Sequence, residues 1–231
     1  MMKSIARSRV IASYYNHTYS VVWAKNNILG IFERYMEFLS PKNSSFVLEL
    51  GGGSNVGHIR YVKNMPSKKY IILDIVLPNK IEQNRIKNLY PKIEFKKGIA
   101  EKIPYSKNYF DHVKITCVLH HVSDIFKAVQ EIRRVTKHEG EIIILVPTDP
   151  GFLNLLVKKI ITYRRINKAS EFPAELIYAL DHQNSIHNVL AVINYVFLKD
   201  SISIKRLPFF VKSVNFNLMY VFKIVINKEL D

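Results

Sequence analysis

Two features near the start of the sequence have the residue types and spacing to bind an adenosine-containing ligand. Residues 49–57 read Glu-Leu-Gly-Gly-Gly-Ser-Asn-Val-Gly, and glycines let the backbone turn sharply and approach a ligand without a Cβ clash. Asp74 follows Gly53 by 21 residues, and a carboxylate there can accept both hydroxyls of a ribose. Taken alone, the two features fit a dinucleotide equally well, and a structural turn with a loop aspartate would look the same.

Alternating strands and helices are expected to position these residues. Short apolar runs predict strands at 46–50, 70–74, 93–95, 110–116 and 141–146, with helices at 55–64 and 124–137. Several runs are nearly all apolar, which is typical of parallel strands covered by helices on both faces. A ligand crevice is then expected at the carboxyl ends of the strands.

Three later segments complete a recognisable series of motifs. They are Gly98-Ile-Ala-Glu-Lys-Ile-Pro-Tyr105, a Tyr109-Phe-Asp strand leading to Leu119-His120-His121, and Arg134-Val-Thr-Lys-His-Glu-Gly140. Together with the glycine turn and Asp74, they give five motifs in the order typical of one family. Over residues 46–147 the chain resembles the class I S-adenosylmethionine-dependent methyltransferases, in particular their type 11 group.

The resemblance implies a cofactor, S-adenosylmethionine with S-adenosylhomocysteine as its product, and a role for each motif residue. The sequence departs from the family pattern at Asn55, which replaces the third glycine of the turn, and at Ile99, which replaces an aspartate. We therefore expect weakened rather than abolished cofactor binding. The implied contacts are Glu49 to the methionine amino group, Gly51 and Gly53 beneath the cofactor, Asp74 to the ribose, Ile75, Ile99 and Ala100 at the adenine, and Thr116, Cys117 and His121 at the methionine part and reaction pocket.

The resemblance also sets the expected fold and its divisions. We expect a Rossmann-like α/β domain, a doubly wound and mainly parallel seven-stranded sheet with one antiparallel strand. Residues 10–39 predict a helix, residues 151–200 predict several, and 202–210 and 216–226 predict two closing strands. The single domain would comprise an N-terminal helical lid (1–45), a cofactor-binding core (46–147), a helical substrate insertion before the last two strands (148–200) and closing strands (201–231).

Candidate catalytic residues lie in the helical insertion. A sulfonium donor needs mainly an aligned acceptor, and a base is required only where the acceptor loses a proton. Asp181 and His182 could form such a base, although the same residues also fit a polar helix break with capping roles. Tyr14 and Tyr15 could form a lid, and His187 could join His182 in contacting the acceptor.

The acceptor itself is approached by elimination. Nucleic acid is disfavoured, because Cys117-Val-Leu-His120 stands where an Asn/Asp-Pro-Pro-aromatic motif would be expected for amine methylation. The preferred hypothesis is a small-molecule or glycan acceptor, a sugar hydroxyl in surface-polysaccharide or lipid-linked glycan synthesis, because residues 147–151, 181–182 and 207–210 resemble methyltransferases of those pathways. One alternative is a lipid or quinone at the membrane surface, because residues 153–166 mix apolar and basic side chains. Another is a non-catalytic adapter, suggested by Asn55 and Ile99.

Composition sets the remaining expectations. The formal net charge of +15 would attract anionic partners, although a Lys-, Asn- and Ile-rich composition produces the same charge. The single cysteine forms no internal disulfide, and no metal-binding spacing of histidines is evident, so no metal is expected. With no long apolar run or secretory signal in the sequence, we expect a cytoplasmic protein that can contact the anionic inner face of the membrane peripherally.

Overall fold

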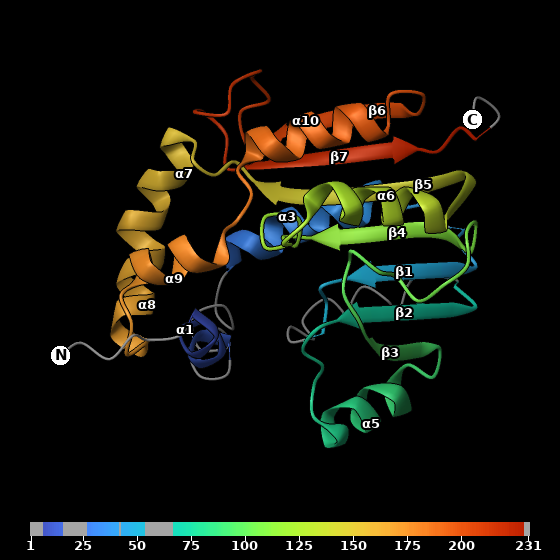
Figure 1. The fold of residues 1–231 in the computed structure, drawn as a ribbon, viewed down its shortest axis with the longest axis horizontal. Coiled ribbons are helices and arrows are strands. Elements are labelled where there is room, and N and C mark those ends of the chain that lie inside the picture. Colours follow the sequence, from blue (N-terminus) through green and yellow to red (C-terminus); the bar gives the residue numbers. More distant parts are fainter. Residues whose placement is uncertain (1–6, 16–26, 42, 54–66, 229–231) are drawn as a thin grey trace.

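A single seven-stranded sheet organises the protein. The computed structural model describes residues 7–15, 27–41, 43–53 and 67–228, and its strands follow the order β3-β2-β1-β4-β5-β7-β6 (Figure 1). Neighbouring strands among β3, β2, β1, β4 and β5 pair in parallel, whereas β7 is antiparallel to both β5 and β6. The expected α/β sheet with one antiparallel strand is confirmed. The strands are β1 (Phe46–Leu50), β2 (Lys69–Asp74), β3 (Ile93–Lys97), β4 (Phe110–Thr116), β5 (Thr136–Pro147), β6 (Ser201–Leu207) and β7 (Met219–Val225).

The central strands β1, β4 and β5 are largely buried because helices cover both faces of the sheet. Alternate residues of a strand point to opposite faces. Accordingly, Ile142 and Ile144 of β5 join the core cluster that contains residues of α6 and α10, whereas Ile143 and Leu145 join the cluster that contains residues of α3. In Figure 1, α6 and α10 lie in front of the sheet and α3 lies behind it. A one-residue shift in the register of β5 would therefore exchange its two sets of core contacts.

Three of the helices begin at side-chain caps. Asn79, Asp124 and Ser185 each accept a hydrogen bond from the backbone N–H three residues later, at 2.9, 2.9 and 3.2 Å. Among the described residues, no helix combines the length and apolar character needed to cross a membrane. The helices are α1 (Arg7–Ser13), α3 (Asn27–Leu39), α5 (Lys80–Leu89), α6 (Ile125–Val135), α7 (Phe152–Val157), a π-helical turn (Lys158–Thr162), α8 (Tyr163–Ala169), α9 (Ala174–Asp181) and α10 (Ile186–Val196).

Some element boundaries differ from the sequence predictions. The helix predicted at 10–39 is described as two helices, α1 and α3, with residues 16–26 outside the described part of the chain. The helix predicted at 55–64 also lies outside it. Helix α5 was not predicted because it is largely polar and only Ile86 is buried, so it has little apolar periodicity. Strand β5 begins at Thr136 rather than at residue 141, because the chain passes from α6 straight into extended backbone.

The helical segment before the last two strands has two parts with different packing. Helix α10 belongs to the main core, since Ile186, Val189 and Ile193 pack there with residues of α6 and the sheet. Helices α7, α8 and α9 instead project beyond the carboxyl ends of the parallel strands, beside α1 (Figure 1). Val10 of α1 shares a separate apolar cluster with Ile177 of α9. Only this outer part is placed where it can cover a ligand at the strand ends.

A buried ion pair joins α3 to the middle of the sheet. Lys114 of β4 is fully buried, and its ammonium group donates to the carboxylate of Glu37 in α3. Removing one partner of such a pair leaves an uncompensated charge in the interior, which typically costs about 3–5 kcal/mol. The contact therefore fixes α3 against the face of the sheet opposite α6 and α10.

We expect the buried histidine of β4 to make folding stability depend on pH. The Nδ1–H of His112 donates to the carbonyl oxygen of Glu141 at 2.9 Å, and burial lowers the pKa of His112 from 6.5 to about 4. The unfolded chain therefore binds this proton at a higher pH than the folded protein, and stability falls as the pH is lowered from 7 towards 4. Between pH 7 and 5 the contribution is about 2 kcal/mol. His112→Asn keeps a donor and should lose correspondingly less stability over that range in urea titrations; an unchanged pH slope would contradict this.

Candidate active site

The carboxyl end of β1 holds a buried carboxylate with one free oxygen. Glu49 is 1% exposed, and its Oε2 accepts a hydrogen bond from the hydroxyl of Tyr70 at 2.8 Å. Its Oε1 is buried and has no hydrogen-bond partner among the described residues. Leaving a buried acceptor unsatisfied costs about 1–3 kcal/mol. An ammonium group bound at this point would satisfy it.

The glycine turn after β1 is packed too tightly for other residues. Gly51 has a φ of +80° and donates its N–H to the carbonyl of Leu73 at 2.9 Å. A Cβ at this position would overlap the Cγ2 methyl of Val118, and a Cβ on Gly53 would overlap the carbonyl oxygen of Val76. The turn therefore presents bare backbone at the ends of β1 and β2, as a ligand cradle requires.

Asp74 holds this turn in place from the end of β2. Its Oδ2 accepts the N–H of Gly53 and its Oδ1 accepts the N–H of Val76, both at 2.9 Å. Burial raises the pKa of Asp74, and the same backbone N–H groups oppose that effect. Each carboxylate oxygen has a second lone pair, so the group can still accept ribose hydroxyls.

Apolar side chains adjoin Asp74 where a flat base would bind. The carbonyl of Asp74 accepts the N–H of Gly98 at 3.0 Å, which brings the turn after β3 to the end of β2. Ile75 and Ile99 expose 60% and 47% of their surface, whereas Ala100 is buried. The residues expected at an adenine therefore gather at two adjacent strand ends.

The end of β4 connects the glycine turn to a group of histidines. Thr116 is buried and donates its hydroxyl to the sulfur of Met36 at 3.8 Å. Cys117 has a φ of +55°, and its N–H donates to the carbonyl of Leu145. The chain then turns so that Val118 contacts Gly51, and the N–H of His121 donates to the carbonyl of Val118 at 2.8 Å. Val118 thus lies between the glycine turn and the histidines, which places the two next to each other.

Three histidines from two segments form a cluster, which we call the histidine cluster. It contains His120 and His121, after β4, and His182, after α9, with ring centroids 3.9 to 5.0 Å apart. The Nδ1 of His182 lies 2.9 Å from Oδ2 of Asp149, and the Nδ1 of His121 lies 3.2 Å from Oδ2 of Asp181. Two of the three rings are therefore oriented by carboxylates.

The carboxylate beside His182 differs from the one the sequence suggested. The sequence hypothesis paired His182 with its neighbour Asp181, but the carboxylate at its ring is Asp149, after β5. Asp181 instead accepts the hydroxyl of Tyr15 at 2.9 Å and faces His121. The reason is local geometry: α9 ends at Asp181, and His182 has extended backbone, so the two side chains diverge.

Burial and charge shift the pKa values of Asp149, His120 and His182. Burial opposes ionisation of Asp149, but its hydrogen bond from His182 and the ammonium of Lys158 outweigh that effect and lower its pKa to about 2. Burial lowers the pKa of His182 to about 4, despite Asp149, and that of His120 well below its usual range. At neutral pH, His120 and His182 are therefore neutral and have a free lone pair for a proton or a cation.

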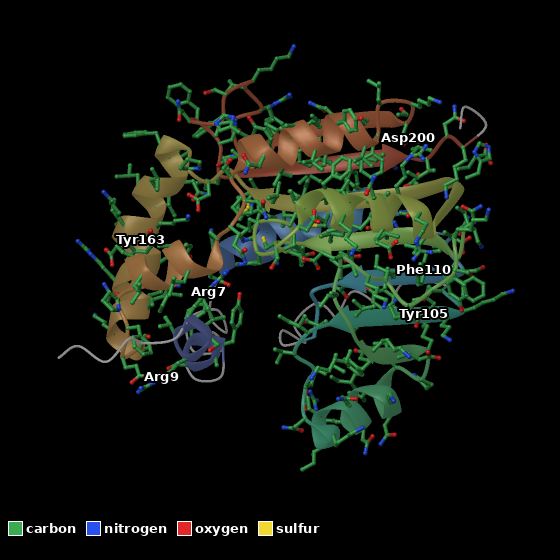
Figure 2. The ribbon with its side chains drawn as sticks, in the orientation of Figure 1. Arg7, Arg9, Tyr105, Phe110, Tyr163 and Asp200 are labelled. Carbon is green, nitrogen blue, oxygen red and sulfur yellow. The ribbon has the colours of Figure 1, made fainter. Side chains whose placement is uncertain are left out.

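A cavity of about 470 Å³ opens beside His182. The ammonium of Lys158 lies 4.5 Å from the ring centroid of Tyr178, and Figure 2 shows Tyr163 on the same helical segment, remote from Tyr105 and Phe110 at the other end of the sheet. The volume fits a small acceptor. The lining includes Asp149, Lys158, Tyr163, Tyr178, His182 and Asn184.

Of the other residues predicted to contact the methyl acceptor, Tyr15 alone reaches the site. Tyr15 reaches the site through Asp181, whereas Tyr14 is buried in the cluster between α1 and α9. His187 is exposed in the first turn of α10 and does not line the cavity. Sequence reasoning missed Asp149 and Lys158. The position of Asp149 directly after a predicted strand was the available signal, since ligand sites lie at carboxyl ends of strands.

A family model and curated relatives match part of the chain. The family model described as "Methyltransferase domain" matches residues 48–144. The demethylmenaquinone methyltransferase of Lactobacillus johnsonii is 32% identical over 125 residues, which cover 52% of this chain and 51% of that protein. The UbiE ubiquinone/menaquinone biosynthesis C-methyltransferase of Vibrio vulnificus is 27% identical over 110 residues, covering 46% and 42%. The chain thus spans about half the length of these relatives.

Solved structures resemble the chain over most of its length. The crystal structure of the YcgJ protein from Bacillus subtilis has a TM-score of 0.56 at 14% identity and covers 87% of this chain and 99% of that one. An S-adenosylmethionine-dependent methyltransferase from Mesorhizobium loti has a TM-score of 0.58 at 12% identity, covering 84% and 96%. The fold is therefore shared well beyond the matched segment. The strand-end site and the match over residues 48–144 identify this chain as carrying a methyltransferase domain of the class I S-adenosylmethionine-dependent family, type 11 group.

Proposed function

We propose that this protein transfers a methyl group from S-adenosylmethionine to a hydroxyl group of a small or glycan acceptor, most simply a sugar. The observation that carries the proposal is the position of the cavity, which adjoins the histidine cluster that follows the end of β4. The acceptor side of the site is thereby continuous with the glycine turn, through Val118.

The residues at the ends of β1 and β2 have the chemistry that this cofactor needs. The free oxygen of Glu49 suits its amino group, and Asp74 suits its ribose. When bound, the cofactor supplies a methyl group activated by a positively charged sulfur. The protein has to exclude water and hold the acceptor in line, and the burial of Glu49 and His120 provides a partly dry site.

His182 has the position required to accept a proton from an acceptor hydroxyl. It lines the cavity, and its Nδ1–H donates to Asp149, which leaves the lone pair of Nε2 as the acceptor. Asp149 is itself held by Lys158, so the imidazole has a fixed orientation. Asp181 acts one step away, since it positions His121 and Tyr15.

A second candidate function is methylation of a quinone or lipid at a membrane surface. Three apolar residues spaced by four positions are exposed along α7 and the π-helical turn. They are Phe152, Leu156 and Ile160, which expose 64%, 43% and 49% of their surface. Lys159 and Arg164 are exposed next to them. Apolar and basic residues at helical spacing suit the interface of an anionic membrane. The quinone methyltransferases among the relatives lend this candidate further support.

Glu49→Gln should weaken cofactor binding while preserving the fold. Glutamine keeps an acceptor for Tyr70 but removes the negative charge, and hydrogen bonds to charged groups contribute about 1.5–3 kcal/mol. Calorimetric titration with S-adenosylhomocysteine should show affinity falling roughly 10- to 100-fold. Glu94→Gln is the matched control, since Glu94 forms an exposed ion pair with Lys69 on β2. Equal affinities for both variants would contradict the assignment, and no binding by the folded wild type would favour the adapter hypothesis.

His182→Asn should slow methyl transfer without changing cofactor affinity. The asparagine amide can still donate to Asp149 but cannot accept a proton, and loss of a general base typically lowers kcat about 10²- to 10⁴-fold. Formation of S-adenosylhomocysteine with free, nucleotide-linked and lipid-linked sugars provides the assay. His138→Asn, on the exposed start of β5, is the control. Unchanged turnover of His182→Asn with the true acceptor would exclude the base.

Vesicle sedimentation should separate the two candidate acceptors. If the acceptor is a membrane lipid or quinone, the protein should sediment with anionic vesicles at low salt, and the double variant Phe152→Gln/Ile160→Gln should remain in the supernatant. Leu198→Gln changes a leucine that is 79% exposed, beyond the end of α10, and should behave as wild type. Absence of salt-sensitive sedimentation by the wild type would contradict the membrane candidate.

A further inference from the structure

The histidine cluster has the composition of a transition-metal site. One ring nitrogen from each of His120, His121 and His182 lies within 4.8 Å of the other two. Zinc bound by histidine has bonds of about 2.0–2.1 Å, which place ligand nitrogens of a tetrahedral site about 3.4 Å apart. Small rotations of the three side chains would bring the nitrogens to that separation.

One of these histidines lacks a partner that a cation would supply. His120 is 4% exposed, and its Nδ1 is buried without a hydrogen bond among the described residues. Buried polar atoms are normally satisfied by a protein group, by water or by an ion. The unpaired nitrogen belongs to the most buried of the three rings, and the other two rings lie against it. The cluster thus contains a free ligand atom.

The other two histidines have the outer hydrogen bonds typical of metal ligands. Histidines that bind metals usually donate their second ring nitrogen to a carboxylate, which fixes the orientation of the ring. His182 has Asp149 in that position and His121 has Asp181. The two carboxylates also provide negative charge beside the cluster, which Lys158 only partly offsets.

The backbone holds the two histidine-bearing segments together. The N–H groups of Gln183 and Asn184 donate to the carbonyl of His120 at 2.8 and 3.1 Å. The side-chain amide of Asn184 donates to the carbonyls of Leu119 and Val122, at 3.1 and 2.7 Å. The ligand atoms are therefore brought together by the fold itself, before any cation binds.

We infer that His120, His121 and His182 bind a divalent transition-metal ion of the zinc class, with its open coordination position towards the cavity. Three imidazole ligands suit zinc, cobalt or nickel far better than magnesium or calcium, which prefer oxygen ligands. A hydroxyl group bound to such an ion has a lowered pKa, so the acceptor hydroxyl would lose its proton to water in the cavity, and His182, as a ligand, would no longer act as the base. That consequence rests on the proposed methyl transfer, whereas the binding of the metal does not.

A calorimetric titration with Zn²⁺ tests the site. The full chain is first treated with EDTA and dialysed. We expect one Zn²⁺ per chain and at least tenfold weaker binding by His121→Asn and by His182→Asn. Asp149→Asn should weaken binding about 10- to 100-fold by freeing the ring of His182. His138→Asn, which removes an exposed histidine outside the cluster, should bind as wild type.

Circular dichroism of each variant shows whether it is folded, so that weaker Zn²⁺ binding is not mistaken for unfolding. A folded His182→Asn that binds Zn²⁺ as tightly as wild type would overturn the inference, because the metal would then be bound elsewhere. Absence of Zn²⁺ binding by the wild type would also overturn it. The visible absorption of Co²⁺ gives a second measurement, since a tetrahedral site gives an intense spectrum that His182→Asn should lose. Neither measurement needs the methyl acceptor, so failure of the proposed function leaves this result interpretable.

Discussion

Hydrogen bonds between the turn after β4 and the segment after α9 hold the two halves of the site together. Asn184 is central, since its side chain spans the carbonyls of Leu119 and Val122 while its backbone donates to His120. Without these contacts the helices beyond the strand ends would still be joined to the sheet through α7, where Asn154 donates to the carbonyl of Leu218, and through α10. The cofactor residues would remain, because β1 and β2 position them, but His182 would lose its place beside His120 and His121.

The sheet was predictable because its physical signal is local. Strands covered on both faces are typically apolar at nearly every position, and runs such as 46–50 and 142–146 show this directly in the sequence. The glycine turn and Asp74 were predictable for a similar reason, since both stand at the carboxyl ends of strands. Helix α5 was missed because it rests on a single buried residue, Ile86, and amphipathic periodicity needs several.

The acceptor side could not be predicted to the same depth because its contacts are distant in sequence. Asp149 and His182 are 33 residues apart, and His121 and Asp181 are 60 apart, so no spacing rule connects either pair. Adjacency favoured Asp181 as the partner of His182, and the end of α9 separated them. The absence of a metal-binding spacing likewise gave no indication of the histidine cluster, which two remote segments assemble.

The reversed direction of β7 has a consequence for how such a protein can diversify. Because β6 runs parallel to β5 and β7 returns beside both, the connection 208–218 emerges at the same edge as the turns that follow β1 and β4. There it meets the start of α7, where the N–H of Leu153 donates to the carbonyl of Asn215. Changes in length or sequence in this connection can reshape the entrance for an acceptor without disturbing the core or the nucleoside-binding turns. The fold thereby separates what must stay constant from what can evolve.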